Sequence, residues 1–159
     1  MQPLLRPIEK KDNAVMKAIV QRSLEEFGLD KPGTAYFDSE LEDLTQAYER
    51  DQSGYWVLEL EGQVIGGVGV FPYVIKEGRA IAEMQKLYID QAYRGRGFAR
   101  LLIEQAIDFS RQHYDALYLE TSSDLKVDRL YEHFGFKKLE GPIGGGVHSA
   151  MDLWYLMEF

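Results

Sequence analysis

The chain has 159 residues, 45% of them hydrophobic and 28% charged, with a formal net charge of -8 and no cysteine. This length and composition predict one folded domain, residues 1–159. The absence of cysteine excludes disulfides, thiolate metal ligands and a cysteine nucleophile. The acidic charge makes a nucleic acid an unfavourable partner and would weakly attract cationic amines. The same charge could equally serve solubility alone.

The N-terminal sequence MQPLLRPIEKKD lacks the apolar run of a signal peptide. No stretch approaches the roughly 20 apolar residues of a membrane-spanning helix. We therefore expect a cytoplasmic protein with no membrane partner.

The first half of the chain predicts a strand at 4–8 and a helix that Asp12 caps, with apolar residues at helical spacing behind it. A loop with a Pro-Gly turn signal follows at 29–37, and a second helix is expected at 39–50. Residues 55–74 read as two strands joined near Glu61-Gly62. In the first of these strands one face is the more apolar, and Pro72 predicts an edge or a break near the end of the second.

The second half predicts a strand at 80–90, an amphipathic helix of about 15 residues, a strand at 115–121 and a short helix that Gly135 stops. The final strands are expected at 136–139 and 150–159. Three consecutive strands favour antiparallel pairing, and the later strand-helix-strand unit favours one parallel pair. The fold class is therefore α/β or α+β, with a mixed, mostly antiparallel sheet flanked by helices.

One strand-to-helix turn, YRGRGFAR at 93–100, concentrates glycine and positive charge in an acidic protein. The first backbone N–H groups of a helix lack internal partners, and the helix dipole favours an anion beside them. Glycine lets the backbone approach a phosphate closely. The turn predicts a phosphate or pyrophosphate site, with a glycine-rich turn bearing solvated arginines as the alternative. The residues that we assign to this site are Arg94, Gly95, Arg96, Gly97, Phe98, Ala99 and Arg100.

The run from Arg94 to Ala99 resembles the [Q/R]-x-x-G-x-[G/A] signature of the GNAT acetyltransferases, and RLYEHFGF at 129–136 resembles their second cofactor motif. The resemblance covers nearly the whole chain and is weakest in the first two predicted helices. It implies that the anion is the pyrophosphate of acetyl-CoA, with no metal. It also implies that the pantetheine arm lies along the backbone of Leu87, Tyr88 and Ile89, and that the Leu87 N–H faces the thioester carbonyl.

The resemblance also implies two catalytic side chains. Glu83 matches the general base of part of the family, and burial in the apolar stretch IAEM would make it a stronger base. Its alternative is a solvent-facing glutamate. Tyr131 matches the tyrosine that protonates the departing thiolate, and its alternative is packing on an amphipathic helix. Strand alternation places the Glu83 and Leu87 side chains on one face, about 13 Å apart along the strand.

Other assignments are less direct. Asp124 stands where relatives often have an asparagine that binds pantetheine, and it could still accept from an amide. The three histidines share no metal-ligand spacing. The block GPIGGGVHSAMDLWY resembles the C-terminal block of a group of small bacterial GNAT proteins. This block implies that His148, Asp152 and Trp154 border the acceptor pocket, with Trp154 in the core as the alternative. Tyr36, Phe37 and Asp38, in the early loop, are further candidates for acceptor contacts.

The function expected from these residues is direct acetyl transfer from acetyl-CoA to a primary amine in a ternary complex. Transfer to a hydroxyl or a protein amine, and a regulatory module that only binds acyl-CoA, are the alternatives. The sequence does not name the acceptor, which could be a small molecule or a peptide. A homodimer is a further possibility, through the apolar C-terminal segment LWYLMEF.

Overall fold

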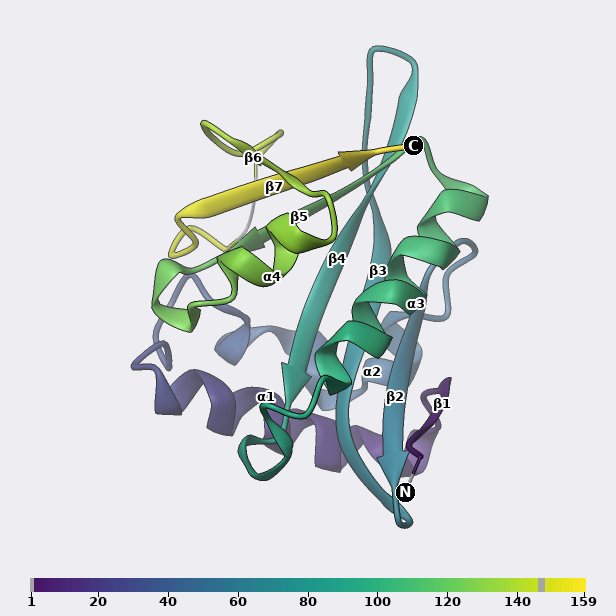
Figure 1. The fold of residues 1–159 in the computed structure, drawn as a ribbon, viewed down its shortest axis with the longest axis vertical. Helices are drawn as coiled ribbons and strands as arrows, with labels where there is room; N and C mark the ends of the chain where they lie inside the picture. Colours follow the sequence, from purple (N-terminus) through teal and green to yellow (C-terminus); the bar gives the residue numbers. More distant parts are fainter. Residues whose placement is uncertain (1, 146–147) are drawn as a thin grey trace.

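The computed structural model describes residues 2–145 and 148–159, in which seven strands form one sheet of order β1-β2-β3-β4-β5-β7-β6 (Figure 1). Only the β4–β5 pair is parallel. The strands are β1 Leu4–Pro7, β2 Gly54–Leu60, β3 Gln63–Lys76, β4 Arg79–Ile89, β5 Ala116–Thr121, β6 Lys137–Leu139 and β7 Leu153–Glu158. The predicted mixed, mostly antiparallel sheet is confirmed.

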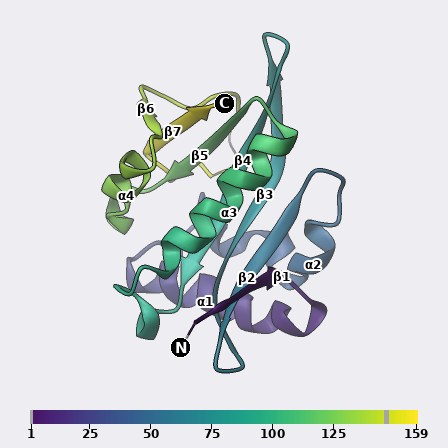
Figure 2. The same ribbon diagram turned by 45° about the vertical axis from the view of Figure 1, so that its right-hand side comes forward.

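Helices cover both faces of this sheet. The α-helices are α1 Asn13–Glu26, α2 Leu44–Ala47, α3 Phe98–His113 and α4 Asp128–His133. Helix α3 packs on one face and α1 on the other (Figure 2). Within the described ranges, no helix is long and apolar enough to cross a membrane.

Strand β2 shows how the two cores are divided. Trp56, Leu58 and Leu60 pack into the cluster that contains helix α3. Tyr55 and Val57, which alternate with them, are buried in the cluster that contains helix α1. The sequence predicts that one face of this strand is more apolar than the other. Both faces are in fact covered, because Tyr55 and Val57 fill the core on the α1 side.

The helix predicted at 39–50 is wrong in extent. The segment forms a 3-10 turn at Ser39–Glu42 and then the single-turn helix α2. Asp43 separates the two with an extended backbone (φ -154°), and its carboxylate accepts from the N–H of Gln46 and from the Asn13 amide. A short acidic side chain that bonds locally to the backbone competes with helix continuation, which explains the break.

Pro72 does not end strand β3, which runs on to Lys76. The pairing of β3 with β2 stops at Val70. Pro72 therefore lies in a part of β3 that pairs only with β4 and has no strand on its other edge. The register with β4 shifts between Pro72 and Val74, which marks a bulge. The predicted edge position is therefore correct, and the predicted break is replaced by a bulge.

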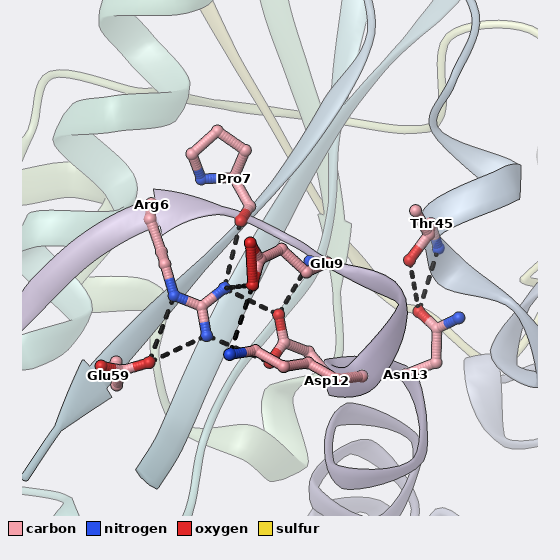
Figure 3. A network of polar contacts seen from close by, with 8 residues as sticks. Arg6, Pro7, Glu9, Asp12, Asn13, Thr45 and Glu59 are labelled. Carbon is pink, nitrogen blue, oxygen red and sulfur yellow. Dashed lines mark hydrogen bonds and ion pairs between the residues drawn. The ribbon is translucent and has the colours of Figure 1, made fainter. Parts of the chain in front are cut away.

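A buried ion pair fixes the N-terminal strand to helix α1 (Figure 3). The Arg6 guanidinium donates to both carboxylate oxygens of Asp12, over 2.8 and 3.1 Å, and also to Glu59. Asp12 is 3% exposed and accepts the Glu9 N–H as well. Burial alone would raise the pKa of Asp12, but these hydrogen bonds outweigh it and hold the pKa below its usual value. Asp12 precedes α1 as expected, yet its carboxylate binds Arg6 and Glu9 instead of the first turn of α1.

Replacing Asp12 with asparagine should lower the free energy of unfolding by about 2 kcal/mol, because the half-buried Arg6 loses its charge-assisted hydrogen bonds to the buried carboxylate and keeps those to Glu59. Urea unfolding measures this at neutral pH, where the native carboxylate is ionised. The contribution of Asp12 is present above its unfolded pKa and is lost as the pH falls through its lower folded pKa, so the difference between the two proteins should shrink in acid.

A matched control is Glu42→Gln, which removes an exposed carboxylate from its pair with Lys17. Surface pairs of this kind are worth about 0–1 kcal/mol. Equal losses for the two variants would contradict the role given to Asp12.

Candidate active site

Strands β4 and β5 diverge and leave a cavity between them. They pair at only three positions, from Ile81–Ala116 to Glu83–Tyr118, and then separate (Figure 1). Beyond this point lies a cavity of about 370 Å³. Its wall includes the end of β4, the arginine-glycine turn, the end of β5 and helix α4. Among its residues are the predicted Leu87, Tyr88, Ile89, Arg94, Gly95, Gly97, Phe98, Ala99, Arg100 and Tyr131.

A bulge in β4 shapes the near wall of this cavity. Lys86 has a positive φ of 50°, and the register with β3 shifts between Gly67 and Gly69. The buried Tyr55 hydroxyl donates to the Lys86 carbonyl over 2.8 Å. A Cβ at Gly67 would lie 2.5 Å from the Tyr55 ring, so this tyrosine can reach the bulge only because position 67 is glycine.

The bulge reverses the alternation of β4. Ala82 and Met84 before it, and Leu87 and Ile89 after it, all pack with the α3 cluster. Glu83 alternates with Ala82 and Met84, so it projects from the opposite face. The prediction that Glu83 and Leu87 share one face is therefore wrong, because the extra residue shifts the strand by one position.

The arginine-glycine turn has the backbone that an anion site requires. Gly95 and Gly97 have φ values of 77° and 80°, and Gly97 is the N-cap residue of helix α3. A Cβ built on either glycine meets no atom within 4 Å, so both face open space. The unpartnered N–H groups at the start of this 16-residue helix lie at the cavity wall. The turn thus fits a bulky anion such as pyrophosphate.

The arginines of the turn divide into two kinds. The Arg94 guanidinium is bound within the protein, to both carboxylate oxygens of Glu26, to Ser23 and to the Ile89 carbonyl. Its charge is thus paired with Glu26, and the side chain joins the end of helix α1 to the turn.

The other two guanidinium groups are bound less firmly. Arg96 lies over the Tyr93 ring, and Arg100 contacts the His133 ring nitrogen at 3.2 Å. Arg100 lines the cavity and Arg96 does not.

Helix α4 brings Tyr131 to the cavity. The residue is 6% exposed and packs against Tyr155 and Phe136. Burial, with the neighbouring phenols Tyr88 and Tyr155, raises its pKa above the usual value of 10. The hydroxyl is therefore protonated at neutral pH. Asp124 lies in the turn before α4, outside the cavity wall, and its N–H donates to Ser122.

Glu83 lies at the point where β4 and β5 separate. Its side chain is 9% exposed and accepts a hydrogen bond of 2.7 Å from the Gln85 amide. Burial, which exceeds the opposing effect of the Gln85 bond, raises the pKa of Glu83 to about 7. A carboxylate with this pKa is about half ionised at neutral pH, as a general base there requires.

Two of the residues predicted for the acceptor pocket, Asp38 and His148, are brought together by the fold. Asp38 lies between the Lys86 ammonium at 2.8 Å and the His148 ring nitrogen at 2.9 Å. Burial opposes the charged form of His148, but the hydrogen bond to Asp38 outweighs it and raises the pKa. This cluster joins the loop after α1, the β4 bulge and the segment before β7. The Lys86 side chain is 2% exposed and also binds Glu40.

Among the described residues, no hydrogen bond joins the side chains of the other predicted acceptor residues to this cluster. The Tyr36 hydroxyl donates to Glu25, and Phe37 is 64% exposed. Asp152 accepts from the N–H and hydroxyl of Ser123. Trp154 packs in the small core around Tyr118. Part of the glycine-rich block, 146–147, lies outside the described residues, and in the ranges that are described no group of three His, Asp or Glu could hold a metal ion.

The family of this chain follows from sequence comparison. The model of the acetyltransferase (GNAT) family matches residues 16–136. This chain belongs to the GNAT family. It is 35% identical over 160 residues to the Escherichia coli (strain K12) protein "Uncharacterized N-acetyltransferase YjgM", covering 98% of this chain and 95% of that one. Human N-acetyltransferase 8B is 35% identical over 118 residues, which are 68% of this chain and 51% of the human protein.

Solved structures agree with this GNAT membership at the level of the fold. A GNAT acetyltransferase from Staphylococcus aureus Mu50 superposes with a TM-score of 0.84 at 15% identity, over 99% of both chains. The putative acetyltransferase yncA from Salmonella typhimurium, whose structure includes its cofactor acetyl-CoA, gives 0.74 at 19% identity, over 99% of this chain and 94% of that one. The protein is an acyltransferase with the GNAT fold.

Replacing Gly97 with valine should weaken CoA binding at least tenfold, since a branched side chain would occupy the open space over the turn. Calorimetric titration with CoA measures the affinity. Gly62→Val is the matched control: Gly62 has the same φ of 80° and open surroundings, but it lies in the β2–β3 hairpin. Both variants should lose similar stability through backbone strain. Equal CoA affinities for the two would contradict the anion site.

Proposed function

We propose that this protein transfers the acetyl group of acetyl-CoA directly to a primary amine in a ternary complex. The observation that carries the proposal is a single cavity bounded by the glycine turn, the separated end of β4 and the Tyr131 side chain. Family membership and the acetyl-CoA in the Salmonella structure support this donor. Cysteine is absent, so a cysteine cannot carry the acetyl group between two half-reactions.

The residues present fit acetyl-CoA. The open space above Gly95 and Gly97 suits the pyrophosphate, and the backbone from Leu87 to Ile89 lines the cavity without a partner on the β5 side. A main-chain donor at Leu87 would stabilise the negative charge that develops on the thioester oxygen during attack. One such donor is worth roughly 3 kcal/mol in comparable sites.

Two proton transfers complete the chemistry. The acceptor arrives as an ammonium, whose N–H bond must break before nitrogen can attack the carbonyl carbon. Glu83 takes that proton, through a water where the amine is out of direct reach. The nitrogen–carbon bond forms and the carbon–sulfur bond breaks. The nitrogen loses its second proton to solvent as the amide forms, and Tyr131 gives its hydroxyl proton to the departing thiolate and regains one from solvent.

Tyr131→Phe should lower kcat about 100-fold, since it removes the proton donor and keeps the ring that packs against Phe136 and Tyr155. Thiol release under saturating acetyl-CoA measures the effect, and the melting temperature controls for packing. An unchanged kcat, with chemistry shown to be rate-limiting, would leave Tyr131 as a packing residue.

Glu83→Gln should lower kcat/KM near neutral pH and leave CoA affinity unchanged. The wild-type profile should fall below about pH 7, where Glu83 becomes protonated. The variant should lose this acid limb and recover part of the rate at high pH, because more amine is then already deprotonated.

The assay is free-thiol release against a panel of amines. Coincident pH profiles for the wild type and Glu83→Gln would exclude Glu83 as the base. A protein that binds CoA and releases no thiol with any amine would be a binding module instead of an enzyme.

A further inference from the structure

A second carboxylate, Glu120, lies beside the point where β4 and β5 separate. Tyr118 pairs with Glu83 across the two strands, and Glu120 follows two residues later on β5. Residues two apart in a strand share a face, so Glu83, Tyr118 and Glu120 project from the same side of the sheet. Glu120 is displaced from the Glu83–Tyr118 pair by about 7 Å along β5.

Hydrogen bonds hold the Glu120 carboxylate in place. The Tyr118 hydroxyl donates to one of its oxygens over 2.8 Å and accepts the Ile143 N–H at 3.2 Å. The Tyr73 hydroxyl donates to the Ile143 carbonyl, and its ring stacks on that of Tyr118 at 4.9 Å. Tyrosines from two strands therefore orient Glu120 through one fixed loop residue.

Glu120 is accessible from the cavity, whereas Glu83 lies behind the cavity wall. Glu120 lines the cavity together with Leu87 and Tyr131, whereas Glu83 does not. Its second carboxylate oxygen receives no hydrogen bond from any described residue, and Glu120 takes part in no ion pair within residues 2–145 and 148–159. A half-buried carboxylate without a cation, next to a second buried carboxyl group, is electrostatically unfavourable until a cation binds.

We propose that Glu120 binds the ammonium group of the acceptor, and that the acceptor is therefore a basic alkylamine, cationic at neutral pH. This inference rests on the proposed acetyl transfer and narrows its substrate class. The Glu120 carboxylate pairs with the ammonium at the cavity end of β5. The proton leaves the nitrogen for Glu83, so the ammonium becomes a neutral amine while the Glu83 carboxylate becomes neutral.

The charged groups around Glu83 set the pH dependence. Glu120 faces it from β5 and raises its pKa, in addition to the larger effect of burial. His148, from the segment before β7, and Lys86, on β4 itself, act in the opposite direction. Tyr48, which follows α2, and Tyr73 from β3 also act on it, and both phenols have raised pKa values and are neutral below pH 10.

The test is Glu120→Gln, which keeps an oxygen to accept the Tyr118 hydrogen bond and removes the charge. Initial rates of thiol release are measured against pH with a linear alkylamine and with an aromatic amine that is uncharged at neutral pH. For the alkylamine, KM should rise about tenfold or more, as expected when a hydrogen bond to a charged group is lost. For the aromatic amine and for acetyl-CoA, KM should not change.

A second readout is the acid limb of kcat/KM, which should move to lower pH in Glu120→Gln because the pKa of Glu83 falls when the neighbouring charge is removed. This shift tests whether Glu120 acts on Glu83 through its charge, whereas the alkylamine KM tests whether Glu120 binds the ammonium group. Glu104→Gln is the matched control: it removes one negative charge from an exposed position of α3 and should change neither KM nor the limb.

The outcomes separate this inference from the proposed function. A wild type that releases no thiol with any amine would overturn acetyl transfer itself, and the role of Glu120 with it. An active wild type whose Glu120→Gln variant keeps its alkylamine KM would overturn only the role of Glu120, whether or not the acid limb moves. The same holds if KM rises equally for charged and uncharged amines.

Discussion

Lys86 occupies a left-handed backbone conformation in the middle of a strand, and much of the site depends on it. This conformation costs roughly 1–2 kcal/mol for a residue with a side chain. The Tyr55 hydroxyl on its carbonyl and the ion pairs of its ammonium with Asp38 and Glu40 offset that cost. Gly67 makes room for the Tyr55 ring. The bulge is thus held by residues that are distant from it in the sequence and belong to the α1 side of the sheet.

The bulge also decides which groups meet in the cavity. In a regular strand, the carboxyl group of Glu83 and the side chain of Leu87 would lie on one face. With the extra residue, Leu87 packs toward helix α3 while Glu83 remains with the cluster of Lys86, Asp38 and His148. Leu87, proposed to contact the acetyl donor, and Glu83, proposed to deprotonate the amine, therefore approach the opening between β4 and β5 from opposite faces of the sheet. Arg94 ties the end of α1 to the glycine turn and so links the elements of the two sides.

The features that could be predicted from the sequence are those that residue type and spacing determine locally. The order of the elements, the positive φ at Gly95 and Gly97 and the burial of Glu83 all follow from residue types and spacing. The bulge at Lys86 does not, because a lysine has no preference for that conformation and the stabilising Tyr55 lies 31 residues away.

Other features could not be predicted for a similar reason. The engagement of Arg94 by Glu26 depends on how α1 packs against the turn, and Asp43 interrupts a segment with good helical periodicity. The sequence shows only that Glu120 is a charged residue at the end of an apolar strand, which is a weak indication of a functional role. Glu120 lines a cavity because β4 and β5 separate, and this separation is a tertiary feature.

The overhanging end of the β3–β4 hairpin has a consequence for association between molecules. This two-stranded ribbon projects past the end of β2 (Figure 1), and Ile75 near its tip is 77% exposed. An unpaired strand bearing an apolar residue would ordinarily recruit a strand from another chain. Pro72 has no N–H to offer such a strand, and the bulge beside it breaks the regular spacing of donors and acceptors. The ribbon can therefore extend into solvent without becoming a template for aggregation.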